Sequence, residues 1–191
     1  MYYNEITLLP SLEISQAFLL SKLFSTIHDR LVTLKDSNDT VPIGISFPEY
    51  SATGNTLGNK LRLFAQKREM LEGFDIKQTL RTYAEYAHHT SIREVPEKTL
   101  TYVQFSRIQP PSTLERIARR KAKRMGISYE NAAEMIHEYA TKKITLPYVI
   151  IKSKSTNKQF SIYIKKEQSN TMEHFTFNTY GLSKGGALPE F

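Results

Sequence analysis

Apolar and polar residues at the start of the chain change from one spacing to another. Residues 2–9 predict a short strand ended by Pro10, and residues 12–35 then carry apolar residues at every third or fourth position, the spacing of a helix face. That face consists of Leu20, Phe24, Ile27 and Leu31. A strand followed by a long amphipathic helix is therefore expected.

After the predicted helix, apolar and polar side chains alternate at every second position, the pattern of a strand. Residues 41–47 and 60–65 alternate apolar and polar side chains and are separated by a loop with Gly and Ser, which predicts two half-buried strands. Helical spacing returns in residues 68–83, and β-branched and aromatic residues around 86–95 favour one more strand. The resulting order, βαββαβ, predicts a ferredoxin-like domain over residues 1–95.

A second domain is predicted over residues 96–191, where the pattern restarts. Residues 101–109 are typical of a strand. Ser112 and Glu115 then have the spacing of a capping box. The helix that they begin would end at Gly126.

Further elements of both kinds complete this second domain. Helical spacing in residues 128–141 is followed by strand patterns in residues 148–153 and 159–165. The fold class expected from the whole chain is therefore α+β, with an N-terminal ferredoxin-like domain and a smaller C-terminal α+β domain that contains an Arg-rich helix.

Positive charge is concentrated in the second half of the chain. The formal net charge is +7, and residues 107–125 alone hold seven Lys or Arg against one Glu. Residues 142–166 add seven Lys and no acid, whereas residues 1–106 hold 11 basic and 12 acidic residues. Such asymmetry indicates a polyanionic partner, which is a nucleic acid, an anionic membrane surface or an acidic protein.

The predicted Arg-rich helix, residues 112–125, separates its charge from its apolar residues. One face is basic and consists of Arg116, Arg119, Arg120, Lys123 and Arg124. The other face consists of Leu114, Ile117, Ala118 and Ala122. A membrane-surface helix needs bulkier apolar residues than these, so the pattern favours a nucleic acid over a membrane. An ordinary solvated face is the competing interpretation.

Composition excludes several classes of protein. A hydrophobic content of 40% with 11% aromatic residues is typical of a folded domain, and the absence of cysteine excludes disulfides, thiolate nucleophiles and cysteine-ligated metals. The first ten residues have no basic n-region or long apolar run, and no segment approaches the roughly 20 apolar residues that span a bilayer. A cytoplasmic location is expected.

Candidate catalytic groups are few. Metal-dependent nucleases need clustered carboxylates, but the acids after residue 107 are scattered, so we predict no metal site and no cofactor. Metal-independent RNA cleavage needs a base for the ribose 2′-OH, and histidine is the natural base near neutral pH. The chain offers His28, His88, His89, His137 and His174. A half-buried helix histidine without a chemical role is the competing interpretation of His28, which adjoins the apolar face of residues 12–35.

Aromatic residues in the second basic segment have two possible roles. Tyr148, Phe160 and Tyr163 can stack on bases or fill the core. The core is the favoured role for Tyr163.

The C-terminal segment and the basic helix together resemble a known family. The sequence Tyr-Gly-Leu-Ser-Lys-Gly-Gly at 180–186 precedes a Pro and the final Phe191, and Ser-Arg-Ile-Gln at 106–109 leads into the Arg-rich helix. These motifs are similar to those of the type I-F CRISPR RNA-processing endoribonucleases, the Csy-type crRNA endonucleases. The resemblance extends over nearly the whole chain, because Ile-Ser-Phe-Pro-Glu-Tyr at 45–50 and Leu-Pro-Tyr-Val at 146–149 occur in the expected order.

The resemblance implies a fold and an activity. It implies a ferredoxin-like domain followed by a smaller domain with an Arg-rich helix. It also implies an enzyme that binds the stem-loop of the CRISPR repeat RNA, cleaves at the 3′ base of the stem without a metal and stays bound to the crRNA. Other subunits of a type I-F crRNA-guided surveillance complex are the implied protein partners.

The resemblance also implies roles for particular residues. His28, in Leu-Phe-x-x-x-His, corresponds to the general base; Ser153 corresponds to the serine that orients the 2′-OH, and Tyr180 to the tyrosine of the catalytic site. Arg107 and Gln109 match the pair that reads purines at the stem base. The remaining RNA-binding residues implied are Ser155, Phe160 and the basic residues of the helix, namely Arg116, Arg119, Arg120, Lys123 and Arg124.

Two other functions are compatible with the residues. One is a non-catalytic module that binds an RNA hairpin, and the other is a ribosome- or protein-associated structural factor whose basic helix contacts an acidic surface. RNA cleavage separates the enzyme from the first alternative, and hairpin binding separates both from the second.

Overall fold

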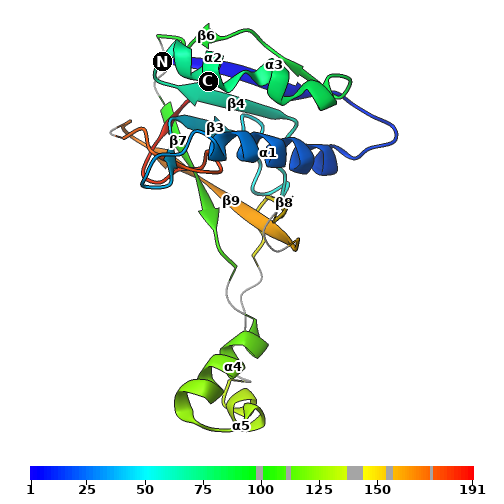
Figure 1. The fold of residues 1–191 in the computed structure, drawn as a ribbon, viewed down its shortest axis with the longest axis vertical. Coiled ribbons are helices and arrows are strands. Elements are labelled where there is room, and N and C mark those ends of the chain that lie inside the picture. Colours follow the sequence, from blue (N-terminus) through cyan, green and yellow to red (C-terminus); the bar gives the residue numbers. More distant parts are fainter. Residues whose placement is uncertain (98–100, 111–112, 137–143, 154–156, 173) are drawn as a thin grey trace. The chain divides into compact units, whose positions relative to one another are not determined.

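In a computed structural model, the chain forms two compact units (Figure 1). The structure describes residues 1–97, 101–110, 113–136, 144–153, 157–172 and 174–191. One unit consists of Met1–Ile108 together with Leu146–Phe191, and the other of Gln109–Thr145. The expected division into 1–95 and 96–191 does not follow these units, because the strands after residue 100 pack with the first sheet in one core. Among the described residues, no helix has the length and apolar character needed to cross a membrane.

The first sheet of the larger unit is antiparallel, with the order β3-β4-β1-β5. Its strands are β1 (Tyr2–Leu8), β3 (Ile43–Ser46), β4 (Lys60–Ala65) and β5 (Ala87–His89). A further short strand, β6 (Arg93–Glu94), pairs with the start of β1. The α+β fold class is therefore confirmed, with the strands of this sheet close to the predicted positions.

The first helix, α1 (Gln16–Val32), follows the predicted apolar pattern. It begins after Ser15, whose hydroxyl accepts a hydrogen bond from the backbone N–H of Phe18. All four residues of the predicted face are buried in the core, namely Leu20, Phe24, Ile27 and Leu31. Burial of this stripe fixes which side of α1 remains available for other contacts.

The helix predicted over residues 68–83 is divided into three short pieces. These are α2 (Arg68–Phe74), α3 (Ile76–Thr79) and the 3₁₀ helix η1 (Arg81–Tyr83). The break lies at Asp75, which adopts a left-handed backbone conformation with φ 48° and accepts a hydrogen bond from the N–H of Gln78. A residue in this conformation ends one helix, and its carboxylate caps the next.

The strand predicted over residues 41–47 is also divided, into β2 (Thr40–Val41) and β3. β2 pairs with β10 (Phe177–Asn178) near the C-terminus. β3 is buried on both faces rather than half-buried as predicted, because Phe177 and Leu188 pack against Gly44. The C-terminal segment therefore covers a face that the local pattern assigned to solvent.

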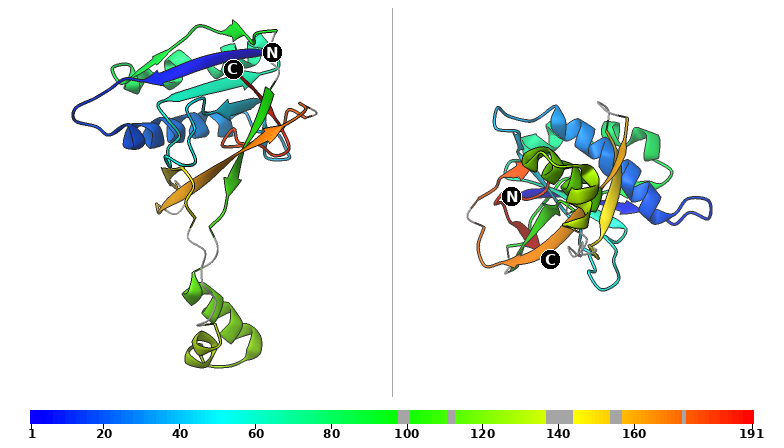
Figure 2. Two further views of the ribbon diagram at one scale, coloured as in Figure 1. Left: turned by 180° about the vertical axis from the view of Figure 1, so that it is seen from behind. Right: turned by 90° about the horizontal axis from the view of Figure 1, so that it is seen from below.

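The second sheet of the larger unit has the order β11-β7-β9-β8. Its strands are β11 (Leu188–Glu190), β7 (Thr101–Ile108), β9 (Gln159–Ser169) and β8 (Tyr148–Lys152). β8 is an edge strand that lies beside α1, as Figure 2 shows. The backbone N–H of Ile150 donates to the hydroxyl of Ser21 at 3.1 Å, so a helix side chain partners a donor that a sheet edge would otherwise expose.

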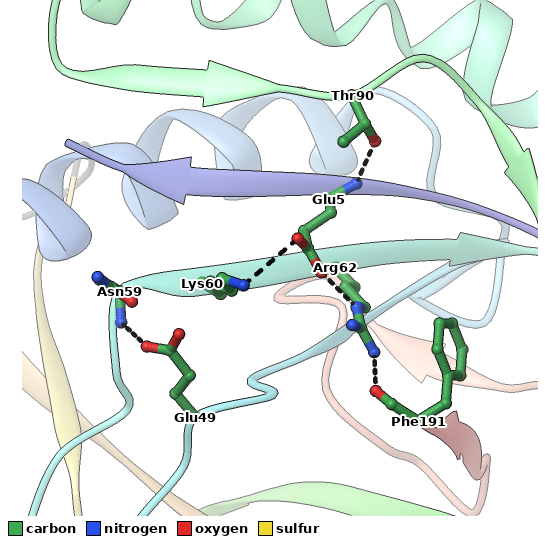
Figure 3. A network of polar contacts seen from close by, with 7 residues as sticks. All are labelled: Glu5, Glu49, Asn59, Lys60, Arg62, Thr90 and Phe191. Atoms are coloured by element: carbon green, nitrogen blue, oxygen red, sulfur yellow. Dashed lines mark hydrogen bonds and ion pairs between the residues drawn. The ribbon is translucent and has the colours of Figure 1, made fainter.

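The C-terminus is joined to the first sheet through Arg62 (Figure 3). The guanidinium of Arg62 donates to Glu5 at 2.7 Å and to the backbone carbonyl of Phe191, and it lies 4.2 Å from the centre of the Phe191 ring. Lys60 forms a second ion pair with Glu5 at 3.7 Å. One arginine on β4 thus holds both β1 and the last residue of the chain.

The smaller unit contains α4 (Leu114–Met125) and α5 (Tyr129–Glu134), which pack against each other. The cap of α4 is Thr113, whose hydroxyl accepts from the N–H of Arg116, rather than the predicted Ser112, which lies outside the described residues. Gly126 ends the helix as predicted, with φ 66°.

The predicted apolar face of α4 is only partly buried. Ala118 is buried, whereas Leu114, the first residue of the helix, is exposed. Residues 137–141 of the second predicted helix lie outside the described residues.

Candidate active site

His28 lies near the end of α1 and is half-buried. Its Nδ1 is 2.8 Å from the backbone carbonyl oxygen of Thr179. A carbonyl oxygen only accepts hydrogen bonds, so this contact places the hydrogen on Nδ1, and in a neutral imidazole it leaves the lone pair on Nε2. The backbone of the C-terminal segment therefore holds a helix histidine in the tautomer whose lone pair is on Nε2.

Tyr180 stacks on His28. The two ring centroids are 4.0 Å apart and the ring planes differ by 16°. The segment that carries Tyr180 is a tight turn in which the side-chain oxygen of Asn178 accepts from the N–H groups of Tyr180 and Leu182, at 2.9 and 3.3 Å. Two consecutive residues, Thr179 and Tyr180, thus fix the orientation of the imidazole.

Arg107, near the end of β7, joins Tyr180 to Phe160 on β9. Its guanidinium carbon lies 5.3 Å from the centre of the Tyr180 ring and 5.8 Å from that of the Phe160 ring. Both distances are within the range of cation–π attraction. His28, Tyr180, Arg107 and Phe160, which come from four separate segments, therefore form one continuous series of contacts.

A hollow of about 450 Å³ adjoins this series, with Arg107 and Tyr180 in its lining. Lys35, Asp39 and Lys184 also line it. Lys35 forms an ion pair with Asp39 at 2.6 Å, and its hydrogen bond and charge lower the pKa of the Asp39 carboxyl. Lys184 donates to the backbone carbonyl of Asn38 at 3.0 Å. The side of the site next to Tyr180 is thus rich in cations.

Ser153 directly follows β8. Its N–H donates to the carbonyl of Lys158 at 2.9 Å, and its carbonyl accepts from the N–H of Asn157 at 2.9 Å. β8 packs against α1, the helix that carries His28, but the role of Ser153 beside His28 stays a prediction. Ser155 lies outside the described residues, so its role is also a prediction.

The other predicted RNA-binding residues belong to the smaller unit. Gln109 is exposed where that unit begins. Five of the six basic residues of α4 are exposed, namely Arg116, Arg119, Arg120, Lys123 and Arg124, and Lys121 is half-buried. The separation of charge from packing on α4 is confirmed for the five exposed residues, and their contacts with RNA stay predictions.

The other histidines that the structure describes, His88, His89 and His174, do not share the environment of His28. His88 and His89 lie on β5, His174 is exposed, and His137 lies outside the described residues. Within the described parts of the chain, no three His, Cys, Asp or Glu side chains gather in a group that could hold a metal ion.

Sequence reasoning missed the groups that orient His28 and the cations near Tyr180. Thr179 acts through its backbone carbonyl, which no side-chain motif identifies. Asn178 could have been found, since Asn before a Gly-containing turn accepts backbone N–H groups through its side chain. Lys35 and Lys184 are more than a hundred residues apart in the chain, so only the fold brings them to one hollow.

The chain is similar to known proteins over nearly its whole length. Residues 3–191 match the model of a family described as CRISPR-associated protein (Cas_Csy4). The chain is 33% identical over 191 residues to the CRISPR-associated endonuclease Cas6/Csy4 of Pseudomonas aeruginosa (strain UCBPP-PA14), covering 100% of this chain and 99% of that protein. It is 29% identical over 193 residues to the protein of the same name from Escherichia coli (strain UTI89 / UPEC), again covering 100% and 99%. The chain therefore belongs to the Csy4 family of CRISPR-associated proteins.

Proposed function

We propose that this protein is an endoribonuclease of CRISPR RNA maturation that binds the repeat hairpin, cleaves at the 3′ base of its stem without a metal and remains bound to the crRNA. Family membership and the names of the relatives support an endonuclease. The observation that carries the catalytic proposal is the contact between His28 Nδ1 and the Thr179 carbonyl, because it leaves Nε2 as a base.

The proposed reaction is attack by the ribose 2′-OH on the adjacent phosphate. Nε2 of His28 removes the 2′ hydrogen, the 2′ oxygen bonds to phosphorus, and the bond from phosphorus to the 5′ oxygen of the next nucleotide breaks. That oxygen takes up a proton from water, and the imidazolium of His28 returns the 2′ proton to water. The products are a 2′,3′-cyclic phosphate and a 5′-OH. Tyr180 would hold the imidazole in place, and Ser153 would orient the 2′-OH.

Binding is assigned to two sets of residues. Arg107, supported by the rings of Tyr180 and Phe160, would contact a guanine at the stem base through O6 and N7, with Gln109 reading a neighbouring purine. Phe160 would stack below the stem, and Ser155 would contact the RNA nearby. The exposed basic face of α4 would bind the phosphates of the stem.

Three broader features belong to the same proposal. The strand order β3-β4-β1-β5, with a helix after β1 and two short helices after β4, supports a ferredoxin-like arrangement in the larger unit. Other subunits of a type I-F surveillance complex are the proposed protein partners. The proposed location is the cytoplasm.

The test is a single-turnover time course on end-labelled repeat hairpin RNA with excess EDTA. The unmodified protein should cleave the RNA, and His28→Ala should cleave on the order of 10² to 10⁴ times more slowly while retaining hairpin affinity. His88→Ala, which alters an exposed histidine on β5, is the matched control and should cleave at the normal rate. Ser153→Ala should slow cleavage by misaligning the nucleophile.

Two results would contradict the proposal. Cleavage that stops in EDTA would require a metal. Normal cleavage by His28→Ala would leave a protein whose histidine has only a structural role, and hairpin binding without any cleavage would favour the non-catalytic RNA-binding module.

A further inference from the structure

A second surface of the larger unit, outside the series of contacts around His28, combines exposed rings with positive charge. It is a groove of about 470 Å³ between α1 and the edge strand β8. Phe18 and Lys22 of α1 line one side, and Tyr148, Ile150 and Lys152 of β8 line the other. No Asp or Glu is found among the described residues that line it.

The rings in this groove are available for contact with a ligand. Phe18 is 55% exposed and Tyr148 is 46% exposed, although both are large hydrophobic side chains. The ammonium group of Lys22 lies 5.2 Å from the centre of the Phe18 ring. Aromatic faces next to lysines, with no acid among them, are the combination by which proteins bind single-stranded nucleic acid without reading its sequence.

The regular geometry of α1 and β8 explains why these side chains share one groove. Along β8, Tyr148, Ile150 and Lys152 alternate with buried residues, so they occupy a single exposed face. Along α1, Phe18 and Lys22 are one turn apart on the side that faces β8. The hydrogen bond from Ile150 to Ser21 fixes the two elements side by side.

Both walls of the groove lead toward predicted catalytic residues. Ser25 is the last residue of α1 in the lining, and His28 follows it by three positions, on the same side of the helix as Ser21. Lys152 ends β8, and Ser153 follows it directly. A strand of RNA that leaves the cleaved bond therefore has this groove as a continuation of the site.

We propose that the groove between α1 and β8 binds the single-stranded RNA that adjoins the base of the hairpin stem. This inference rests on the proposed function, since it takes the repeat RNA as the substrate. Phe18 and Tyr148 would stack on bases, and Lys22 and Lys152 would pair with phosphates. The lysines favour RNA over an apolar protein segment as the occupant, because two positive charges without a carboxylate complement a polyanion.

The test compares three hairpin RNAs made uncleavable by a 2′-deoxy nucleotide before the cleaved bond. One is the bare hairpin, one has a single-stranded 3′ extension, and one has a 5′ extension. The 3′ and 5′ arms distinguish which flank occupies the groove. The RNA whose extension occupies the groove should bind the unmodified protein at least about fivefold more tightly than the bare hairpin. This is the gain in affinity expected for one stacked base.

The double variant with Phe18→Ala and Tyr148→Ala should lose this gain and still bind the bare hairpin normally. The variant with Lys22→Ala and Lys152→Ala should lose part of the gain in affinity, and the gain that remains should depend less on salt concentration. The control is the double variant with Lys67→Ala and Lys77→Ala, which removes two exposed lysines outside the groove and should keep the full gain. Thermal unfolding of each variant checks that the exposed substitutions leave the fold intact.

Each contrary outcome has a distinct meaning. If neither extension increases affinity, or if the gain survives in the aromatic double variant, this inference is wrong and the proposed function stands. If the aromatic variant instead abolishes self-association of the free protein, the groove is a contact between copies of the chain. If the unmodified protein neither binds the bare hairpin nor cleaves the all-ribose repeat hairpin of the time course, the proposed function fails and the inference fails with it.

Discussion

The imidazole of His28 lies nearly parallel to the phenol ring of Tyr180, with ring centroids 4.0 Å apart. The residue before Tyr180, Thr179, holds Nδ1 of His28 through its backbone carbonyl, although 151 positions separate Thr179 from His28 in the chain. A helix of the first half of the chain and a turn near its end thus meet at the proposed catalytic site. The predictions that follow test the arrangement, the fold that supports it and its contacts with RNA.

Tyr180→Phe should retain most of the cleavage rate, whereas Tyr180→Ala should cleave about 10²-fold more slowly. Phenylalanine keeps the ring that holds His28 in place, and alanine removes it, which permits misplacement of the base on the scale that costs this much. Single-turnover rates on the repeat hairpin provide the measurement. Equal losses in the two variants would show that the hydroxyl of Tyr180, rather than its ring, is required.

Gly181→Ala should reduce both stability and cleavage. Gly181 has φ 69°, and a Cβ added there would lie 2.5 Å from a side-chain carbon of the buried Ile45, so the turn that carries Tyr180 would have to move. Gly185→Ala is the matched control, because Gly185 also has a positive φ of 99° but an added Cβ would meet nothing within 4 Å. In both variants alanine must adopt a positive φ, so this strain is common to the two. A larger loss of stability in urea unfolding and of cleavage rate for Gly181→Ala therefore isolates the contact with Ile45.

Arg62→Ala should lower the free energy of unfolding by about 1 to 3 kcal/mol, because it removes hydrogen bonds to the Glu5 carboxylate and the Phe191 carbonyl. Arg68→Ala removes an ion pair with Glu72 in which both side chains are about half exposed, and it should cost no more than about 0.5 kcal/mol. Urea denaturation of both variants tests the difference. Similar losses would mean that Arg62 contributes no more than a surface charge.

Arg107→Ala should weaken binding to the native hairpin and reduce the preference for the native base pair at the foot of the stem. A bidentate contact with guanine provides about 1 to 3 kcal/mol of discrimination, whereas a phosphate contact carries no sequence information. Binding of native and base-swapped hairpins should be compared, with Arg81→Ala, on the exposed helix η1, as the control. An equal loss for both hairpins would assign Arg107 to the RNA backbone.

The double variant with Arg119→Ala and Arg120→Ala should bind the hairpin more weakly and with a shallower dependence on salt. Each phosphate contact that is lost should reduce the slope of log K against log salt by about 0.7 to 0.9. Titrations at several salt concentrations give this slope. The Lys67→Ala and Lys77→Ala control should keep it, and an unchanged slope in the arginine variant would make the basic face of α4 an ordinary solvated surface.

The sequence by itself determined the elements whose residues interact with near neighbours. The buried stripe of α1, the αL end of α4 at Gly126 and the exposed basic face of α4 follow from spacings of three and four residues, and the strands follow from alternation. The helices and strands depend on short-range geometry, which a linear pattern records. His28, Tyr180, Arg107 and Phe160 were identified only through the resemblance of their motifs to those of the Csy-type endonucleases.

Tertiary structure decided which distant segments meet. The burial of β3 on both faces depends on Phe177 and Leu188, and the orientation of His28 depends on the Thr179 carbonyl. The same holds for the division of the chain, because β7, β8 and β9 join the first sheet in a common core while residues 109–145 form their own unit. Backbone groups and long-range packing leave no periodic trace in the sequence, so these relationships appear only when the chain is folded.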